Sequence, residues 1–190
     1  MHTLLNFNIQ SKGALSQAFL HRGIYTFKAA TVYICDLPYG RNSNKDDLLS
    51  FFADGKGTCS TKHAVLKQMA AEQGYTDLKL ILGIFKMNGQ NTPLVGNTLT
   101  HYQLDYIPEA HTYLKYKNQR FDFTRTGASP ADFQSDLLVE YEIQANEIGA
   151  YKVQVHQAFM AQWLEENGTI PYSLAEIWTI REQCIQDLSV

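Results

Sequence analysis

One cysteine in this chain follows a glycine-rich stretch and stands at the start of a predicted helix. Cys59 comes after Gly55, Gly57 and a potential helix-capping residue, Thr58. At the first turn of a helix, unsatisfied backbone N–H groups and the positive end of the helix dipole stabilise a thiolate, and the same N–H groups can bind an oxyanion. The pattern therefore predicts that Cys59 is a nucleophile.

The other two cysteines lack this setting. Cys35 lies in a stretch that we predict to be rich in β-structure, and Cys184 lies on a predicted helix. Most cysteines are small buried residues without a chemical role, and we expect this of both. Three cysteines cannot all pair within one chain, and they show no CxxC spacing for zinc or a redox pair, so a reducing compartment is favoured.

A histidine and an aspartate fall on a predicted β-hairpin. Residues 111–116 and 121–124 alternate like two strands that turn at Lys117-Asn118. In this register His111 and Asp122 share one face of the hairpin and are diagonal neighbours on the two strands, with their backbones about 7–8 Å apart. This distance makes a hydrogen bond between the carboxylate and the imidazole feasible. The other face is predicted to be apolar, with Leu114 opposite Phe121 and Thr112 opposite Phe123.

Two alternatives accompany this interpretation. His63 lies one helical turn after Cys59 on the same helix face, but it has no third group to orient its ring, so we expect it to pack or bond locally. On the hairpin alone, His111 and Asp122 could equally be a surface histidine and a solvated carboxylate. Their pairing gains weight only together with Cys59.

The cysteine, histidine and aspartate, in this order, resemble the motifs of the transglutaminase-like superfamily. The similarity extends over about half the chain, from Pro38 to Thr124. Two features depart from the family pattern. Arg120 and Phe121 stand where a tryptophan usually precedes the aspartate, and no aromatic oxyanion contact is obvious ahead of the cysteine, for which Tyr39 and Asn42 are candidates. The matching segments are Gly57-Thr58-Cys59-Ser60-Thr61-Lys62-His63, Pro108-Glu109-Ala110-His111-Thr112-Tyr113-Leu114 and Phe121-Asp122-Phe123-Thr124.

The resemblance implies an α+β fold with a transglutaminase-like or papain-like core, in which the cysteine-bearing helix packs on an antiparallel sheet. We expect a single domain of residues 1–190, with this core at about 25–128 and a helical extension at 129–190. In such an enzyme Cys59 is the nucleophile, His111 the base and Asp122 the residue that orients the base.

The chemistry implied is acyl transfer from an amide of a peptide or protein through a thioester. The outcome is peptide hydrolysis, glutamine deamidation or transamidation, and residues outside the three-residue site choose among them. No cofactor is implied, and the chain has no loop of spaced carboxylates for calcium. The alternative is a non-enzymatic binding or scaffolding module on the same fold.

The elements that must position these residues can be predicted from local patterns. The best-defined is a helix from Thr58 to Gln73, with Gly74 as its terminator, followed by a strand from Leu78 to Met87 that is apolar on both faces. The other predicted elements are a helix at Ser11–His21, a β-rich stretch at Tyr25–Cys35, a helix capped by Ser43 and ended by Gly55, and helices at Ala131–Ala145, Ala150–Glu166 and Ser173–Leu188.

Composition and charge exclude several classes of protein. A hydrophobic fraction of 45% and a charged fraction of 18% are typical of a folded globular domain. The formal charge is -3, without a basic stripe for phosphates, so nucleic acid is not expected as a partner. Neither Met1–Gly13 nor the apolar run Leu78–Phe85 has the pattern of a signal peptide or a membrane span, and we expect a cytoplasmic protein.

The predicted C-terminal helices carry many large apolar side chains. These side chains suit ordinary packing on the catalytic core, which we favour, and they also suit a homo-oligomer interface. The residues concerned are Phe159, Trp163, Leu164, Ile177, Trp178 and Ile180.

Overall fold

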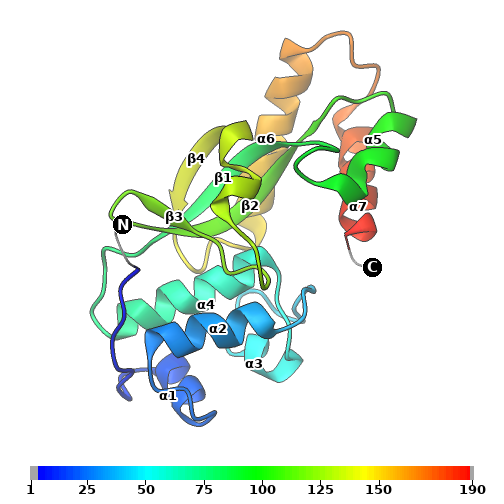
Figure 1. The fold of residues 1–190 in the computed structure, drawn as a ribbon. Coiled ribbons are helices and arrows are strands. Elements are labelled where there is room, and N and C mark those ends of the chain that lie inside the picture. Colours follow the sequence, from blue (N-terminus) through cyan, green and yellow to red (C-terminus); the bar gives the residue numbers. More distant parts are fainter. Residues whose placement is uncertain (1–3, 189–190) are drawn as a thin grey trace. The chain divides into compact units, whose positions relative to one another are not determined.

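The computed structural model describes residues 4–188 and shows an α+β protein with a four-stranded antiparallel sheet (Figure 1). The α+β class predicted from the sequence is therefore confirmed. Residues 1–3 and 189–190 lie outside the described part of the chain. The first three belong to the stretch Met1–Gly13, in which we expect no signal peptide. The strand order is β3-β2-β1-β4, with β1 at Lys79–Met87, β2 at Ile107–Tyr116, β3 at Gln119–Phe121 and β4 at Leu137–Ile143.

The chain divides into two compact units. The first contains the chain up to Leu82 together with His111–Pro130 and Tyr141–Gly149. The second contains Gly83–Ala110, Ala131–Glu140 and the chain from Ala150 onward. All three predicted site residues therefore belong to the first unit.

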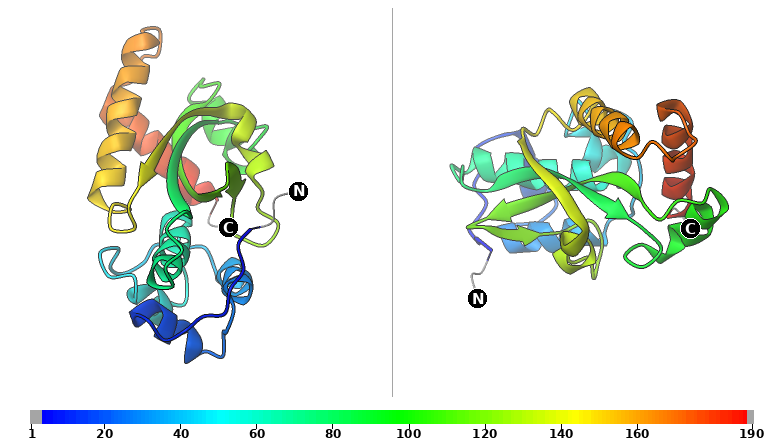
Figure 2. Two further views of the ribbon diagram at one scale, coloured as in Figure 1. Left: turned by 90° about the vertical axis from the view of Figure 1, so that its left-hand side faces the viewer. Right: turned by 90° about the horizontal axis from the view of Figure 1, so that it is seen from above.

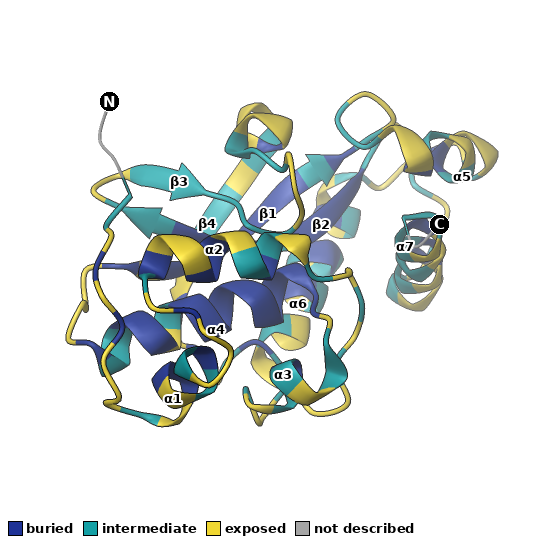
Figure 3. Ribbon diagram, turned by 60° about the horizontal axis from the view of Figure 1, so that its bottom comes forward, coloured by how far each residue is buried: buried dark blue, intermediate teal, exposed yellow. Residues whose placement is uncertain are grey.

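Four helices belong to the first unit, and the helix that begins at Cys59 is the most deeply buried of them. This helix, α4 (Cys59–Glu72), contacts α1 (Ala14–Leu20) and α2 (Phe27–Asp36), and it is buried along most of its length (Figure 3). The fourth helix, α3, spans Ser50–Asp54. The prediction of α4 is confirmed, including its end, because Gly74 follows it with a φ of +89°.

The segment predicted to be β-rich is instead helix α2, so that prediction was wrong. Its buried residues are spaced as on one face of a helix, and the Thr26 hydroxyl caps its start by accepting a hydrogen bond from the Ala29 N–H. Val32, which we took for part of a strand alternation, is 54% exposed. The buried residues are Phe27, Ala30, Thr31 and Ile34.

The helix predicted to begin at Ser43 begins only at Ser50, so the predicted start of this helix was wrong. Ser43 donates its hydroxyl to the Asp54 carboxylate instead of capping a helix. Before α3, the side chains of Asn44 and Asp47 accept hydrogen bonds from backbone N–H groups two residues further on. Such local bonds compete with a helix and delay its start.

The hairpin of β2 and β3 has the predicted register. Leu114 pairs with Phe121, and the turn residues Lys117 and Asn118 both have positive φ, as a tight hairpin turn of type I′ requires. Strand β3 ends at Phe121, however, so the predicted continuation of the pairing to Phe123 is wrong. Asp122 therefore follows the end of β3, where the alternation of a strand no longer determines the direction of its side chain.

The predicted helix at Ala131–Ala145 is also wrong, because the second half of this segment forms strand β4. Two short 3-10 turns, Pro130–Asp132 and Gln134–Asp136, precede the strand. Strand β4 pairs with β1, and an ion pair of 2.6 Å between Lys79 and Glu142 joins the two strands at the surface. The segment is a strand because it pairs with β1, which lies far from it in the sequence, so its local pattern did not predict it.

The second unit contains α5 (Gly96–His101), α6 (Ala150–Glu166) and α7 (Leu174–Asp187), and α5 and α6 both contact α7 (Figure 2). The predictions of α6 and α7 are confirmed. No helix among residues 4–188 is long and apolar enough to span a membrane. Of the apolar residues predicted for packing or oligomerisation, Trp163, Ile177 and Ile180 are buried, whereas Phe159, Leu164 and Trp178 are partly exposed.

Candidate active site

Cys59 is the first residue of α4 and is 6% exposed. The glycine two residues earlier permits a close approach of the chain: a Cβ on Gly57 would lie 2.7 Å from the Phe51 ring. The Gly57 N–H also donates to the Pro38 carbonyl at 3.1 Å, which fixes the entry into the helix. Because the sulfur sits at the positive end of a 14-residue helix, negative charge on it is stabilised.

His111, on β2, is hydrogen-bonded on both sides. Its Nε2 lies 2.8 Å from Asp122 Oδ2, and its ring is also hydrogen-bonded to the Cys59 side chain. Because Nε2 faces the carboxylate, Nδ1 is the nitrogen left for the sulfur. The His111 side chain is 16% exposed and that of Asp122 is 5% exposed, so the imidazole is the part of this pair that solvent reaches.

The charges of the site favour an ion pair between His111 and Asp122. Burial lowers the pKa of His111, but the charges of Asp122 and Cys59 and the hydrogen bonds to both outweigh it and raise the pKa to about 10. Burial also opposes ionisation of Asp122, yet His111 and the other hydrogen-bond donors hold the pKa of its carboxyl well below the usual range. At neutral pH the imidazole is therefore an imidazolium, hydrogen-bonded to the Asp122 carboxylate and to the Cys59 side chain.

Asp122 is itself held in place by the residue two positions further on. Its Oδ1 accepts hydrogen bonds from the Thr124 N–H at 2.9 Å and the Thr124 hydroxyl at 2.6 Å. The other oxygen, Oδ2, is left for His111. This division of the two oxygens orients the carboxylate and, through it, the imidazole.

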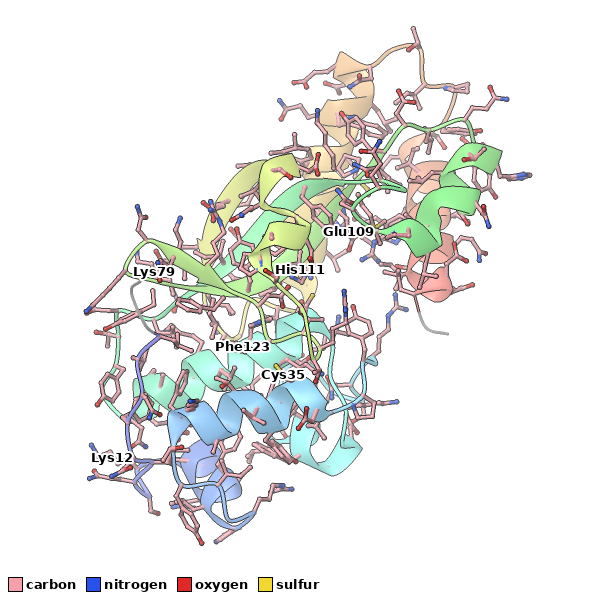
Figure 4. All side chains as sticks on the ribbon, in the orientation of Figure 1. Lys12, Cys35, Lys79, Glu109, His111 and Phe123 are labelled. Atoms are coloured by element: carbon pink, nitrogen blue, oxygen red, sulfur yellow. The ribbon has the colours of Figure 1, made fainter. Side chains whose placement is uncertain are left out.

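His63 is a neutral bridge rather than a base. Its Nδ1 donates to the Cys59 carbonyl at 2.7 Å, and its Nε2 accepts from the Phe123 N–H at 2.7 Å, so both partners together determine the tautomer. Complete burial lowers its pKa to about 4. The bond to the Cys59 carbonyl is local, as predicted, whereas the bond to Phe123 joins residues 60 positions apart and was not predicted. The His63 ring also contacts the rings of His111 and Phe123, which are labelled in Figure 4.

The other cysteines are poor nucleophiles by comparison. Burial raises the pKa of Cys35, and it raises the pKa of Cys184 to about 12. None of the three cysteines is in a disulfide. A thiol with a raised pKa has little reactive thiolate at neutral pH.

Of the two candidates for an oxyanion contact, Asn42 has other partners. It donates its amide N–H groups to the Asp54 carboxylate and the Lys56 carbonyl, so it serves the loop ahead of α4. The Tyr39 backbone forms a parallel bridge with Gly57, which holds Tyr39 beside the entry to α4. The N–H groups at the amino-terminal end of α4 can also stabilise an oxyanion.

Several residues around the site were not indicated by the sequence pattern. Ser60 hydrogen-bonds with Thr112 at 3.2 Å, and Lys62 is completely buried between two backbone carbonyls. The only sequence signal for Lys62 is its place beside His63 on the buried helix. Within residues 4–188, no group of three or more histidine, cysteine, aspartate or glutamate side chains is arranged to hold a metal ion.

The fold and the site together define an α+β protein with a thiol, an imidazole and a carboxylate in series. No family model, curated protein or solved structure matches the chain.

Proposed function

We propose that this protein is a cysteine-dependent acyl-transfer enzyme that acts on an amide through a thioester intermediate. The observation that carries the proposal is the hydrogen-bonded series from Asp122 through His111 to Cys59. A nucleophile, a base within its reach and a third group that orients the base are the parts that covalent acyl transfer needs. The order of the three residues supports a transglutaminase-like enzyme as the class.

In the proposed reaction the Cys59 thiolate attacks the amide carbonyl carbon, and the oxygen takes the negative charge near the start of α4. The His111 imidazolium gives its Nδ1 proton to the leaving nitrogen as the C–N bond breaks, which leaves a thioester on the sulfur. Neutral His111 then takes a proton from water or from an amine as it attacks the thioester. Cys59 leaves as the thiolate, and the imidazolium is restored.

The proposal leads to a first prediction about the reactive thiol. Iodoacetamide at neutral pH should alkylate Cys59 before Cys35 and Cys184, because burial disfavours the other two thiolates. Mass spectrometry of the digested protein identifies the modified residue. Faster alkylation of either other cysteine would contradict the assignment of the nucleophile.

The reaction itself is tested with peptide amides and glutamine-containing peptides, with and without a primary amine. Cleavage identifies a protease, ammonia release a deamidase, and amine incorporation a transamidase. Each activity should disappear in Cys59→Ala and His111→Ala, and a substrate acyl group should be found on Cys59 by mass spectrometry. A reactive Cys59 that turns over none of these substrates would favour the alternative, a binding or scaffolding module.

A further inference from the structure

Lys62 carries a charge that the proposed reaction does not use. Its side chain is completely buried, three residues after Cys59 on α4. The ammonium donates to the Leu37 carbonyl, at the end of α2, and at 2.8 Å to the Thr124 carbonyl. Thr124 is also the residue that holds Asp122. One side chain thus ties α4 to two segments of the first unit, one of them next to the site.

The surroundings of Lys62 are negative. Burial lowers its pKa, and nearby groups that become anions oppose this effect. A buried ammonium is costly unless such groups compensate for it, and backbone carbonyls supply only partial charges. The groups near it that carry or can take a negative charge at neutral pH are Asp36 on α2, Asp122 after β3, and Cys59 on its own helix. Cys35 on α2 is also near, but its raised pKa keeps it a neutral thiol.

A count of charges shows what Lys62 adds. Asp36 is exposed, so solvent screens its charge. With the buried site ionised, Cys59 and Asp122 are each negative and His111 is positive, which leaves one negative charge in excess. His63 is neutral and cannot offset it. Lys62 supplies the missing positive charge from the same helix as the thiolate.

We propose that Lys62 is a positioning residue that balances the negative charge of the site and holds the Asp122 segment against α4, so that Cys59 and Asp122 are ionised together. This inference rests on the proposed function, because it concerns the same thiolate and imidazolium. Lys62 does not replace His111 as the base, since its described hydrogen bonds go to backbone carbonyls.

The test is the pH profile of Cys59 alkylation by iodoacetamide in charge-removing and charge-keeping variants. Lys62→Met removes the charge and the donors, Lys62→Gln removes the charge but keeps an amide donor, and Lys62→Arg keeps the charge. The neutral variants should move the midpoint of the profile to higher pH by roughly one unit, the lower end of the effect of a nearby opposite charge. Lys62→Arg should move it less.

The matched control is Lys67→Met, the same substitution on the same helix at a partly exposed position, which should leave the profile unchanged. An unchanged midpoint in a neutral Lys62 variant with a native circular dichroism spectrum would overturn the proposal. A purely structural role for Lys62 would lower the melting temperature without moving the midpoint.

If neither neutral variant folds, the wild-type protein provides the test through ¹⁵N NMR of the Lys62 Nζ. An ammonium signal at pH 7 supports the proposal, and a neutral amine overturns it. Failure of the proposed function is distinguishable: it appears as a wild-type midpoint like that of an ordinary thiol, whereas the Lys62 proposal is read from the shift between variants.

Discussion

The imidazole of His111 can act as a base only if the correct nitrogen carries the proton, and Asp122 decides which one does. The carboxylate only accepts hydrogen bonds, so it requires a proton on Nε2 and leaves Nδ1 for the thiol. In Asp122→Asn the side-chain oxygen can still accept from Thr124, which places the amide nitrogen toward His111. That nitrogen donates, so the imidazole must present an unprotonated Nε2, and its proton moves to Nδ1.

The Asp122→Asn variant should therefore lose activity and keep its fold. Turnover should fall by as much as about 10⁴, the scale found when a triad aspartate is replaced and the tautomer is wrong. The measurements are kcat/KM on a peptide from the panel above that the wild-type protein turns over, and the melting temperature, which should change little. A variant that unfolds yet keeps its activity per folded molecule would show that Asp122 supports the fold only.

At the scale of elements, a buried ion pair connects β2 to α7 in the second unit. Arg181 makes two hydrogen bonds to the Glu109 carboxylate, and both side chains are nearly buried. Burial raises the pKa of Glu109, but the charge and hydrogen bonds of Arg181 outweigh it and lower the pKa. Each charge is tolerated in this place because the other is present.

Removing one partner of this pair should be costly. Arg181→Met leaves Glu109 buried without its counter-charge and should lower the free energy of unfolding by about 3–5 kcal/mol. Lys79→Met breaks the pair with Glu142, in which both side chains are about half exposed, and should cost roughly 0–1 kcal/mol. Urea unfolding measures both. Equal losses in the two variants would contradict the distinction between buried and exposed pairs.

For the whole molecule, the two site histidines make stability depend on pH in opposite directions. The pKa of His63 falls from 6.5 to about 4 on folding, so its contribution is present above pH 6.5 and is lost as the pH falls through 4. The pKa of His111 rises to about 10, so its contribution is present below pH 6.5 and is lost as the pH rises through 10. Stability should be highest near neutral pH.

His63 makes a large contribution to the acid side of this profile. Its shift corresponds to roughly 3 kcal/mol lost between pH 6.5 and 4. In His63→Gln, a side chain that keeps a donor and an acceptor but does not titrate, the slope should be smaller, although the stability at pH 7 is lower. A slope remains in the variant because burial also lowers the pKa of His156. Unfolding free energies measured across this range provide the check. The same slope in the variant and the wild type would show that other groups cause it.

The sequence by itself determined the elements whose signals are local. Gly57, Thr58 and Gly74 mark the limits of α4, because tight entry, a cap position and a left-handed terminator are properties of a few neighbouring residues. The register of β2 and β3 followed from alternation and a two-residue turn, and α6 and α7 followed from their own periodicity. These signals were enough to select Cys59, His111 and Asp122 as candidates.

Tertiary structure decided the rest, because it depends on what packs against a segment. Residues 27–36 became a helix through the face they bury, and residues 137–143 became a strand through pairing with β1, although their local patterns suggested otherwise. The bridge from His63 to the Phe123 N–H and the burial of the Lys62 ammonium join groups about 60 residues apart in the chain, a separation over which no periodicity carries information.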